Sequence, residues 1–119
     1  MTGYEVGWTD TAWEAIRVEA RVIAVERGAT STAQRWLERI WDAVESLEQW
    51  PRRFAKAPEG AFVDYEVRRV VVGRYLLLFT IDDERRRVWV IGLRHGHRLP
   101  RPQDLPPAQP GSEDTNRKG

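Results

Sequence analysis

Two short stretches of the sequence contain side chains that could do chemistry together. They are residues 68–75 and 94–98, and the side chains concerned are Arg68, Arg69, Arg74, Tyr75, Arg94, His95, His97 and Arg98. Arginine can hold phosphate through paired hydrogen bonds, and histidine can transfer protons near neutral pH. Cleavage of RNA without a metal needs both. The alternative is structural: the imidazoles cap a strand end, and the arginines pair with Asp64, Glu66 or Asp82.

The short motifs that mark common catalytic and metal sites are missing from the sequence. It contains no nucleotide-binding glycine loop, no HExxH or GxSxG motif, no cluster of His, Asp and Glu with metal-ligand spacing, and no cysteine. We therefore expect no metal and no cofactor. A chain without disulfides fits the cytoplasm. No segment reaches the roughly 20 apolar residues that cross a bilayer, so we expect no membrane contact.

Charge is distributed unevenly along the 119 residues, whose formal net charge is +1. Residues 10–50 hold eight acids and five arginines, a balance of −3, whereas residues 51–98 hold eleven basic residues and six acids, a balance of +5. The basic half could attract phosphate or an acidic protein surface. A solvated sheet face with a charged turn would give the same pattern.

A strand followed by a helix is predicted at the start of the chain. Residues 3–8 alternate in polarity, which is typical of a half-buried strand. Thr11 and Glu14 fit a capping box, so a helix should run from about Thr11 to Arg27 and end at Gly28.

A second helix, antiparallel to the first, is predicted before Pro51. Ser31 and Gln34 repeat the capping-box pattern, and the helix should reach about Gln49. Its apolar face comprises Ala33, Trp36, Leu37, Ile40, Val44 and Leu47.

Three further strands are expected as a meander over residues 65–72, 75–81 and 86–94. The middle strand is apolar almost throughout, so both of its faces should be covered. If it lies between the other two, the arginines and imidazoles would share one rim. The order β-α-α-β-β-β predicts an α+β fold, a helical hairpin packed on a mostly antiparallel four-stranded sheet. We expect a domain over residues 1–98 and a flexible, proline-rich tail over residues 99–119.

The first helix carries more apolar surface than one sheet contact needs, and six tryptophans exceed what so small a core can hold. Trp41 lies off the main face of the second helix, so it is a candidate anchor for a protein interface. The alternative is that the second helix buries the extra face of the first and that Trp41 covers its edge.

Several features occur together between Tyr4 and Arg98. They are an opening strand that ends in Trp8-Thr9, Ala12, a helix carrying Ala33 to Leu47 before Pro51, the VRRVVVGRYLLLF hairpin and the VWVIGLRHGHR ending. In this combination the chain resembles the RelE/ParE toxins of type II toxin–antitoxin systems. The resemblance implies a sheet backed by a helical hairpin, growth arrest by the free toxin, and a cognate antitoxin whose helix or strand covers it. The residues expected to contact that antitoxin are Trp13, Val18, Val22, Val25 and Trp41.

Departures from the family pattern bear on the branch. RelE-like members cleave messenger RNA on the ribosome, whereas ParE-like members inhibit DNA gyrase. RNA-cleaving members usually carry arginine directly after the tyrosine of a GxY motif, where this chain has Leu76, and a catalytic tyrosine where it has Leu99 and Pro100. Arg69 and Arg94 match basic positions of the family. The HGxR ending, residues 95–98, looks ParE-like.

Three hypotheses follow. The first is a ParE-like toxin that is not an enzyme and binds DNA gyrase through Arg68, Arg69, Arg74, Tyr75, Arg94, His95 and Arg98. The second is a ribosome-dependent mRNA endoribonuclease, with phosphate held by Arg69, Arg74 and Arg94, and with His95 or His97 as general acid or base. The third is an antitoxin-binding module without toxicity.

Overall fold

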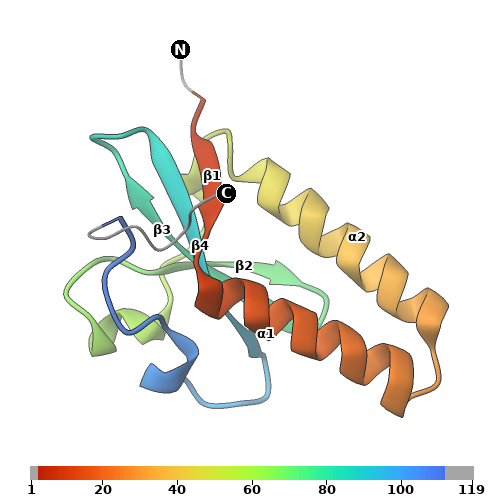
Figure 1. Ribbon diagram of the computed structural model, residues 1–119. Helices are drawn as coiled ribbons and strands as arrows, with labels where there is room; N and C mark the ends of the chain where they lie inside the picture. The colour runs from red at the N-terminus through yellow and green to blue at the C-terminus, as the bar shows by residue number, and fades with distance from the viewer. Residues whose placement is uncertain (1–2, 112–119) are drawn as a thin grey trace.

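The computed structural model describes residues 3–111. Its helices and strands, drawn in Figure 1, are β1 (Glu5–Trp8), α1 (Asp10–Arg21), the π-helical turn η1 (Val22–Glu26), α2 (Thr30–Ser46), β2 (Arg68–Val72), β3 (Tyr75–Asp82) and β4 (Arg87–His95). Short 3-10 turns lie at η2 (Pro51–Arg53), η3 (Pro58–Phe62) and η4 (Pro102–Asp104). Among residues 3–111, no helix combines the length and the apolar character needed to cross a membrane.

The four strands form one sheet in the order β1-β4-β3-β2. β3 pairs antiparallel with β2 and with β4, while β1 lies parallel to β4, with Glu5 opposite Arg87 and Trp8 opposite Val90. The helical hairpin of α1 and α2 covers one face of this sheet (Figure 1). The predicted α+β fold, a helical hairpin on a mostly antiparallel four-stranded sheet, is therefore confirmed.

The main core lies between the helices and the sheet. Ile16 of α1 and Ile40 of α2 are fully buried against Leu77, Phe79 and Val90 of the sheet. The predicted core face of the second helix is correct, because all its members are buried except Leu37, which is half-buried. Apolar spacing of three and four residues was sufficient to identify that face.

The predicted caps of both helices are wrong. α1 begins at Asp10, and its cap is Thr9, whose Oγ1 accepts a hydrogen bond from the backbone N–H of Ala12 at 3.2 Å. No side chain caps the start of α2, where Ala29 holds the capping position. Thr9 is buried beside β4, and its hydroxyl lies 3.3 Å from the carbonyl oxygen of Val90, so the packing of the sheet selects this threonine.

Replacing Thr9 by alanine is expected to lower the free energy of unfolding by about 1 kcal/mol, because a buried N–H at the start of α1 loses its acceptor. Urea denaturation measures the change. Thr11→Ala removes the threonine of the predicted capping box and should have a much smaller effect. A larger loss in Thr11→Ala than in Thr9→Ala would contradict this assignment of the cap.

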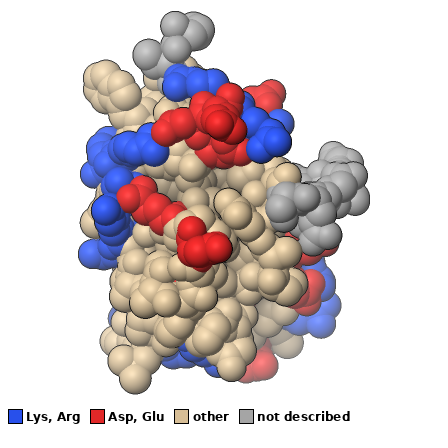
Figure 2. Space-filling view, turned by 90° about the vertical axis from the view of Figure 1, so that its left-hand side faces the viewer, with Lys and Arg blue, Asp and Glu red and all other residues tan. Residues whose placement is uncertain are grey.

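The second face of the sheet is covered by irregular segments, as the apolar character of the middle strand predicts. Leu78 of β3 and Ile91 of β4 are fully buried there against Val67 and Leu105. Figure 2 looks onto the side of the molecule that is at the left in Figure 1. Residues that are neither acidic nor basic occupy a large continuous area of it, with lysine and arginine along the left-hand margin.

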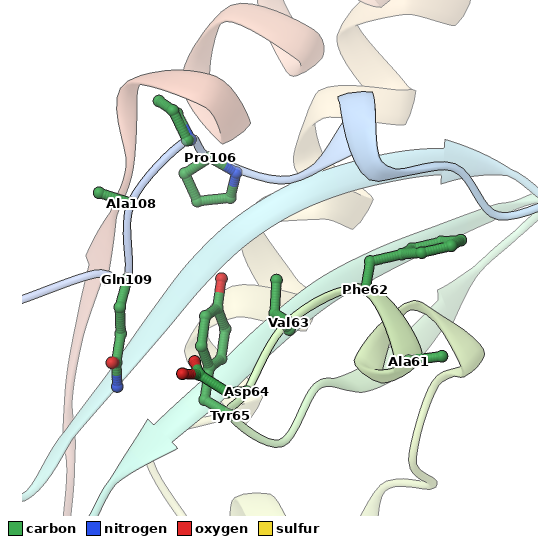
Figure 3. A pocket seen from close by; sticks show the side chains of 9 residues that line it. Ala61, Phe62, Val63, Asp64, Tyr65, Pro106, Ala108 and Gln109 are labelled. Carbon is green, nitrogen blue, oxygen red and sulfur yellow. The ribbon is translucent and has the colours of Figure 1, made fainter.

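The segment after residue 98 differs from the predicted flexible tail over residues 99–111. Leu105 is buried in the second apolar cluster, and a Cβ on Gly92 would overlap the carbonyl oxygen of Asp104. A hollow of about 450 Å³ lies between residues 61–65 and 106–109, where Tyr65 faces Gln109 (Figure 3). The rest of the predicted tail, residues 112–119, lies outside the described residues.

Candidate functional site

The end of the sheet where β3 begins and β4 ends brings three aromatic and imidazole rings together. Tyr75 pairs with His95 across β3 and β4. The His95 ring lies edge-on to Tyr75, with 4.9 Å between ring centroids, and is stacked on His97 at 4.7 Å. The expected arrangement, with the middle strand between the other two, is therefore present, and it assembles this part of the predicted rim.

Tyr75 is tied to the helical layer. Its hydroxyl donates a hydrogen bond to the carboxylate of Glu19 on α1, and its ring packs against Trp36 of α2. Burial, together with the Glu19 carboxylate, raises the pKa of Tyr75 to about 12. The phenol therefore keeps its proton at neutral pH and acts as a hydrogen-bond donor.

His95 has a restricted protonation state. Burial and the neighbouring His97 lower the pKa of the His95 imidazole, against an opposing effect of Glu19. The backbone N–H of His97 donates to Nδ1 of His95 at 3.2 Å, which leaves Nε2 of His95 as the protonated nitrogen. At neutral pH this imidazole is uncharged and offers one N–H donor.

Arg94 does not join these rings. Successive residues of a strand point to opposite faces, and Arg94 points to the second face of the sheet, where it forms an ion pair with Glu59 of η3. Both side chains are buried, and Nη1 of Arg94 also donates to the carbonyl of Arg98 at 2.8 Å. This arrangement ties η3 and the segment after β4 to the sheet.

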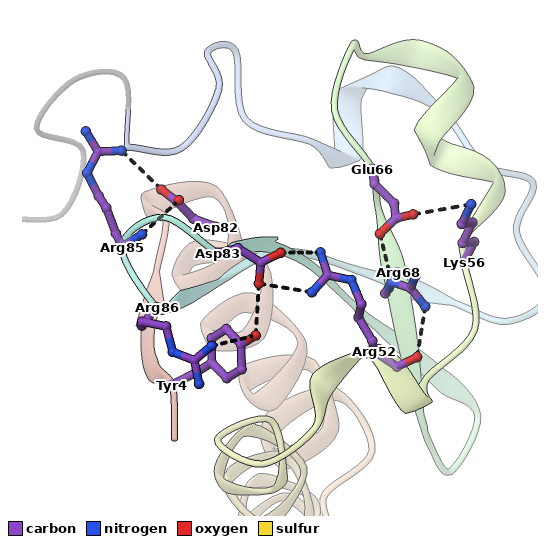
Figure 4. Close-up of polar contacts among 9 residues, drawn as sticks. All are labelled: Tyr4, Arg52, Lys56, Glu66, Arg68, Asp82, Asp83, Arg85 and Arg86. Carbon is purple, nitrogen blue, oxygen red and sulfur yellow. Dashed lines mark hydrogen bonds and ion pairs between the residues drawn. The ribbon is translucent and has the colours of Figure 1, made fainter. Parts of the chain in front are cut away.

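Arg68 and Arg69 lie away from the rings as well. Arg68 stands opposite Phe79, pairs with Glu66 at 2.9 Å and donates to the carbonyl of Phe54, so it follows the structural alternative (Figure 4). Arg69 pairs with Leu78 in the middle of β2. The predicted site residues thus lie in separate places, and only residues 74–75 and 95–98 meet near the turn between β2 and β3.

A hollow of about 350 Å³ adjoins the rings between α1 and the segment after β4. Its lining mixes both charges, and the residues are Glu14, Ala15, Val18, Glu19, Tyr75, Leu93, His95, Arg98, Arg101 and Asp104. Within residues 3–111, no three His, Asp or Glu side chains converge in a way that would hold a metal ion.

An apolar stripe runs along the outer side of α1 and η1, and we define it as Val18, Val22 and Val25. Val25 is 70% exposed and Val18 48% exposed, while Val22 is half-buried. A shallow hollow of about 330 Å³ follows the stripe, flanked by charged residues such as Arg17 and Glu26. These are three of the residues predicted to contact an antitoxin.

The other two residues predicted to contact an antitoxin belong to a cluster of tryptophans. Trp13 of α1 and Trp41 of α2 are stacked with 6.0 Å between their centroids, and both pack edge-on against Trp8. Trp41 therefore covers an edge, as the structural alternative holds, yet Trp13 and Trp41 both stay substantially exposed. The cluster joins the two helices and keeps an accessible aromatic surface.

Some residues that matter in the structure were not singled out from the sequence. Glu19 counted only as a helical acid, and Glu59 lies in a loop with no pattern to mark it. Trp50 was counted only among the six tryptophans, although an aromatic residue directly before Pro51 and two arginines is a visible signal.

Tyr75→Phe should destabilise the protein by about 1.5–3 kcal/mol near neutral pH, because the hydrogen bond to the Glu19 carboxylate is lost. The pKa of Tyr75 is raised above its unfolded value of about 10, so this contribution is present below pH 10 and lost as pH rises towards 12. Denaturation of both proteins across that range measures it. A difference in stability that stays constant up to pH 12 would contradict the assignment.

Comparison with known proteins agrees with this architecture. The family model described as the ParE toxin of the type II toxin–antitoxin system parDE matches residues 6–100, from β1 to the end of β4 and just beyond. A search of curated proteins gave no match. The matched range contains both helices, the whole sheet from Val6 onward and the three rings, so the chain belongs to the ParE toxin family of type II toxin–antitoxin systems.

Proposed function

We propose that this ParE-family toxin arrests growth by binding a protein target, with DNA gyrase as the candidate, in the cytoplasm. The observation that carries the choice between protein binding and RNA cleavage is the burial of Arg94. Its guanidinium is paired with Glu59 on the opposite face from His95, so the residues expected to cleave RNA do not surround one phosphate.

The proposed target surface is centred on Arg74, Tyr75, His95, His97 and Arg98. Uncharged His95 and protonated Tyr75 present ring surface beside basic groups, a combination that is frequent at protein interfaces. Arg68 and Arg94 hold partners within the chain, so we leave them outside this surface.

A type II toxin has an antitoxin partner, and we propose that it lies across the apolar stripe and the tryptophan cluster. An amphipathic helix can place anchors three and four residues apart into such a surface. The spacing of Val18, Val22 and Val25 along α1 and η1 matches that kind of contact. We also propose that the folded unit extends past residue 98 to include residues 99–111.

Induction of the chain without its antitoxin is the deciding experiment. We expect growth arrest, loss of DNA supercoiling and intact messenger RNA. Cleaved messenger RNA at the onset of arrest would instead establish the endoribonuclease, and normal growth would favour a module that only binds its antitoxin.

Surface variants then separate the two proposed contacts. His95→Ala with Arg74→Ala should abolish arrest while the melting temperature stays close to that of the parent. Val18→Asp with Val25→Asp should keep arrest but escape rescue by the co-expressed antitoxin. Phe62→Asp, at an exposed apolar position in η3, is the matched control and should still be rescued. Rescue of the valine variant would exclude the stripe.

A further inference from the structure

We infer that a hollow at the C-terminal end of α2 is a second docking site, which takes an acidic segment of a protein partner carrying one aromatic or large aliphatic anchor. The hollow measures about 460 Å³ and is lined by Tyr4, Trp50, Pro51, Arg52, Arg53 and Arg86. It lies beside β1, at the opposite end of α2 from the turn that joins it to η1 (Figure 1). The inference does not depend on the proposed function.

Trp50 presents an aromatic surface in an unusual backbone conformation. Its side chain is 72% exposed, and its φ of 48° lies in the left-handed region that glycine and asparagine adopt far more readily than tryptophan. Pro51, which is buried, disfavours a right-handed helical conformation at the preceding residue. Strained positions that hold a side chain outward cluster at functional sites.

The walls around Trp50 are already in place. The Arg86 guanidinium lies 4.2 Å from the centroid of the Tyr4 ring, and Tyr4 donates to Asp83 at 2.9 Å. Arg52 pairs with the same carboxylate at 2.7 Å, and Figure 4 shows Tyr4, Arg52 and Arg86 arranged around Asp83. Groups that are positioned before a partner arrives lose little conformational freedom on binding.

The charge around the hollow favours an acidic partner. Three arginines line it, and no acid is among the lining residues. Arg52 and Tyr4 lower the pKa of the Asp83 carboxyl, so one negative charge stands against three positive ones. The resulting positive potential would draw carboxylates towards the rim while Trp50 contacts an apolar anchor.

A protein segment fits this chemistry better than a nucleic acid. The guanidinium of Arg52 already donates to Asp83, and that of Arg53 to the carbonyls of Gln49, Trp50 and Ser46 at the end of α2. Paired hydrogen bonds to phosphate would have to displace these contacts. Tryptophan, tyrosine and arginine are also the residues that most often dominate the free energy of protein–protein binding.

The test uses the full chain and synthetic probes. The first is a heptapeptide with phenylalanine between two runs of three acids, the second replaces its phenylalanine by alanine, and the third is a thymidine octanucleotide. NMR follows the indole N–H of Trp50, assigned through Trp50→Phe. We expect a saturable shift with the phenylalanine peptide, at least about tenfold tighter than with the alanine peptide, and weaker at high salt.

Variants separate binding from folding. Trp50→Gly relieves the left-handed conformation, so it should keep the melting temperature and bind the peptide at least about tenfold more weakly. Trp50→Asn, which also tolerates this conformation, should behave alike, and Leu99→Ala, at another exposed apolar position, should bind as the parent does. No saturation at millimolar peptide, equal affinity for the two peptides, unchanged binding in both Trp50 variants, or tighter binding of the octanucleotide would each overturn the inference.

Discussion

Glu59→Ala is expected to lower the free energy of unfolding by about 3–5 kcal/mol, a large part of the stability of a typical small domain. Glu59 has no exposed surface and Arg94 is 5% exposed, so the substitution would leave a buried guanidinium without its carboxylate. Urea denaturation monitored by tryptophan fluorescence measures the change. Because the pair joins η3 to β4, we also expect faster amide exchange around η3.

The matched controls isolate the effect of burial. Glu14→Ala breaks an exposed pair with Arg17 and should change stability little. Glu59→Leu combined with Arg94→Met replaces both charges by apolar groups and should recover most of the loss, because Oε1 of Glu59 has no hydrogen-bond partner among the described residues. Equal losses in Glu59→Ala and the double variant would show that the ion pair itself does not explain the effect.

Gly92→Ala should detach residues 101–105 from β4 and destabilise the protein by about 1–3 kcal/mol. The added Cβ would overlap the carbonyl oxygen of Asp104, which is backbone and cannot rotate away as a side chain can. Trypsin should then cut after Arg101 faster than in the parent, and Leu105 should lose its buried environment. Timed proteolysis followed by mass spectrometry measures the rate.

Gly3→Ala is the matched control, because the nearest atom to its added Cβ is 3.8 Å away on the Gln49 side chain. It should melt and be cut as the parent is. If Gly92→Ala and Gly3→Ala were cut at the same rate, the close contact between β4 and the segment after it would be excluded.

Local patterns in the sequence predicted the architecture well. Apolar spacing identified the buried face of α2, and the uninterrupted apolar run of β3 indicated that both faces of the middle strand are covered. The resemblance to ParE-like toxins is confirmed by the family match over residues 6–100. These features depend on residues close to one another in the sequence, or on a combination of motifs along the chain.

The candidate site was predicted less well, because its residues were grouped by closeness in sequence. The alternation of β4 alone places Arg94 and His95 on opposite faces, and this could have been foreseen. The partner of Arg94 could not, since Glu59 is 35 residues away in a loop. The cap at Thr9 likewise depends on contact with Val90, which no local pattern encodes.

Composition misjudged the segment after β4. Prolines and few apolar groups predicted a flexible tail over residues 99–119, yet one leucine and the absence of a side chain at Gly92 are enough to seat residues 101–105 on the sheet. Leu105 lies in a proline-rich sequence and Gly92 lies in a strand, so neither residue alone indicates the contact.

The parallel pairing of β1 with β4 has a consequence for synthesis on the ribosome. Glu5 is among the first residues made, and its partner Arg87 is made 82 residues later, so the first strand has no neighbour in the sheet until most of the chain has emerged. A truncated nascent product would lack the finished architecture. A cell that makes this protein therefore meets the complete toxin only near the end of each round of translation.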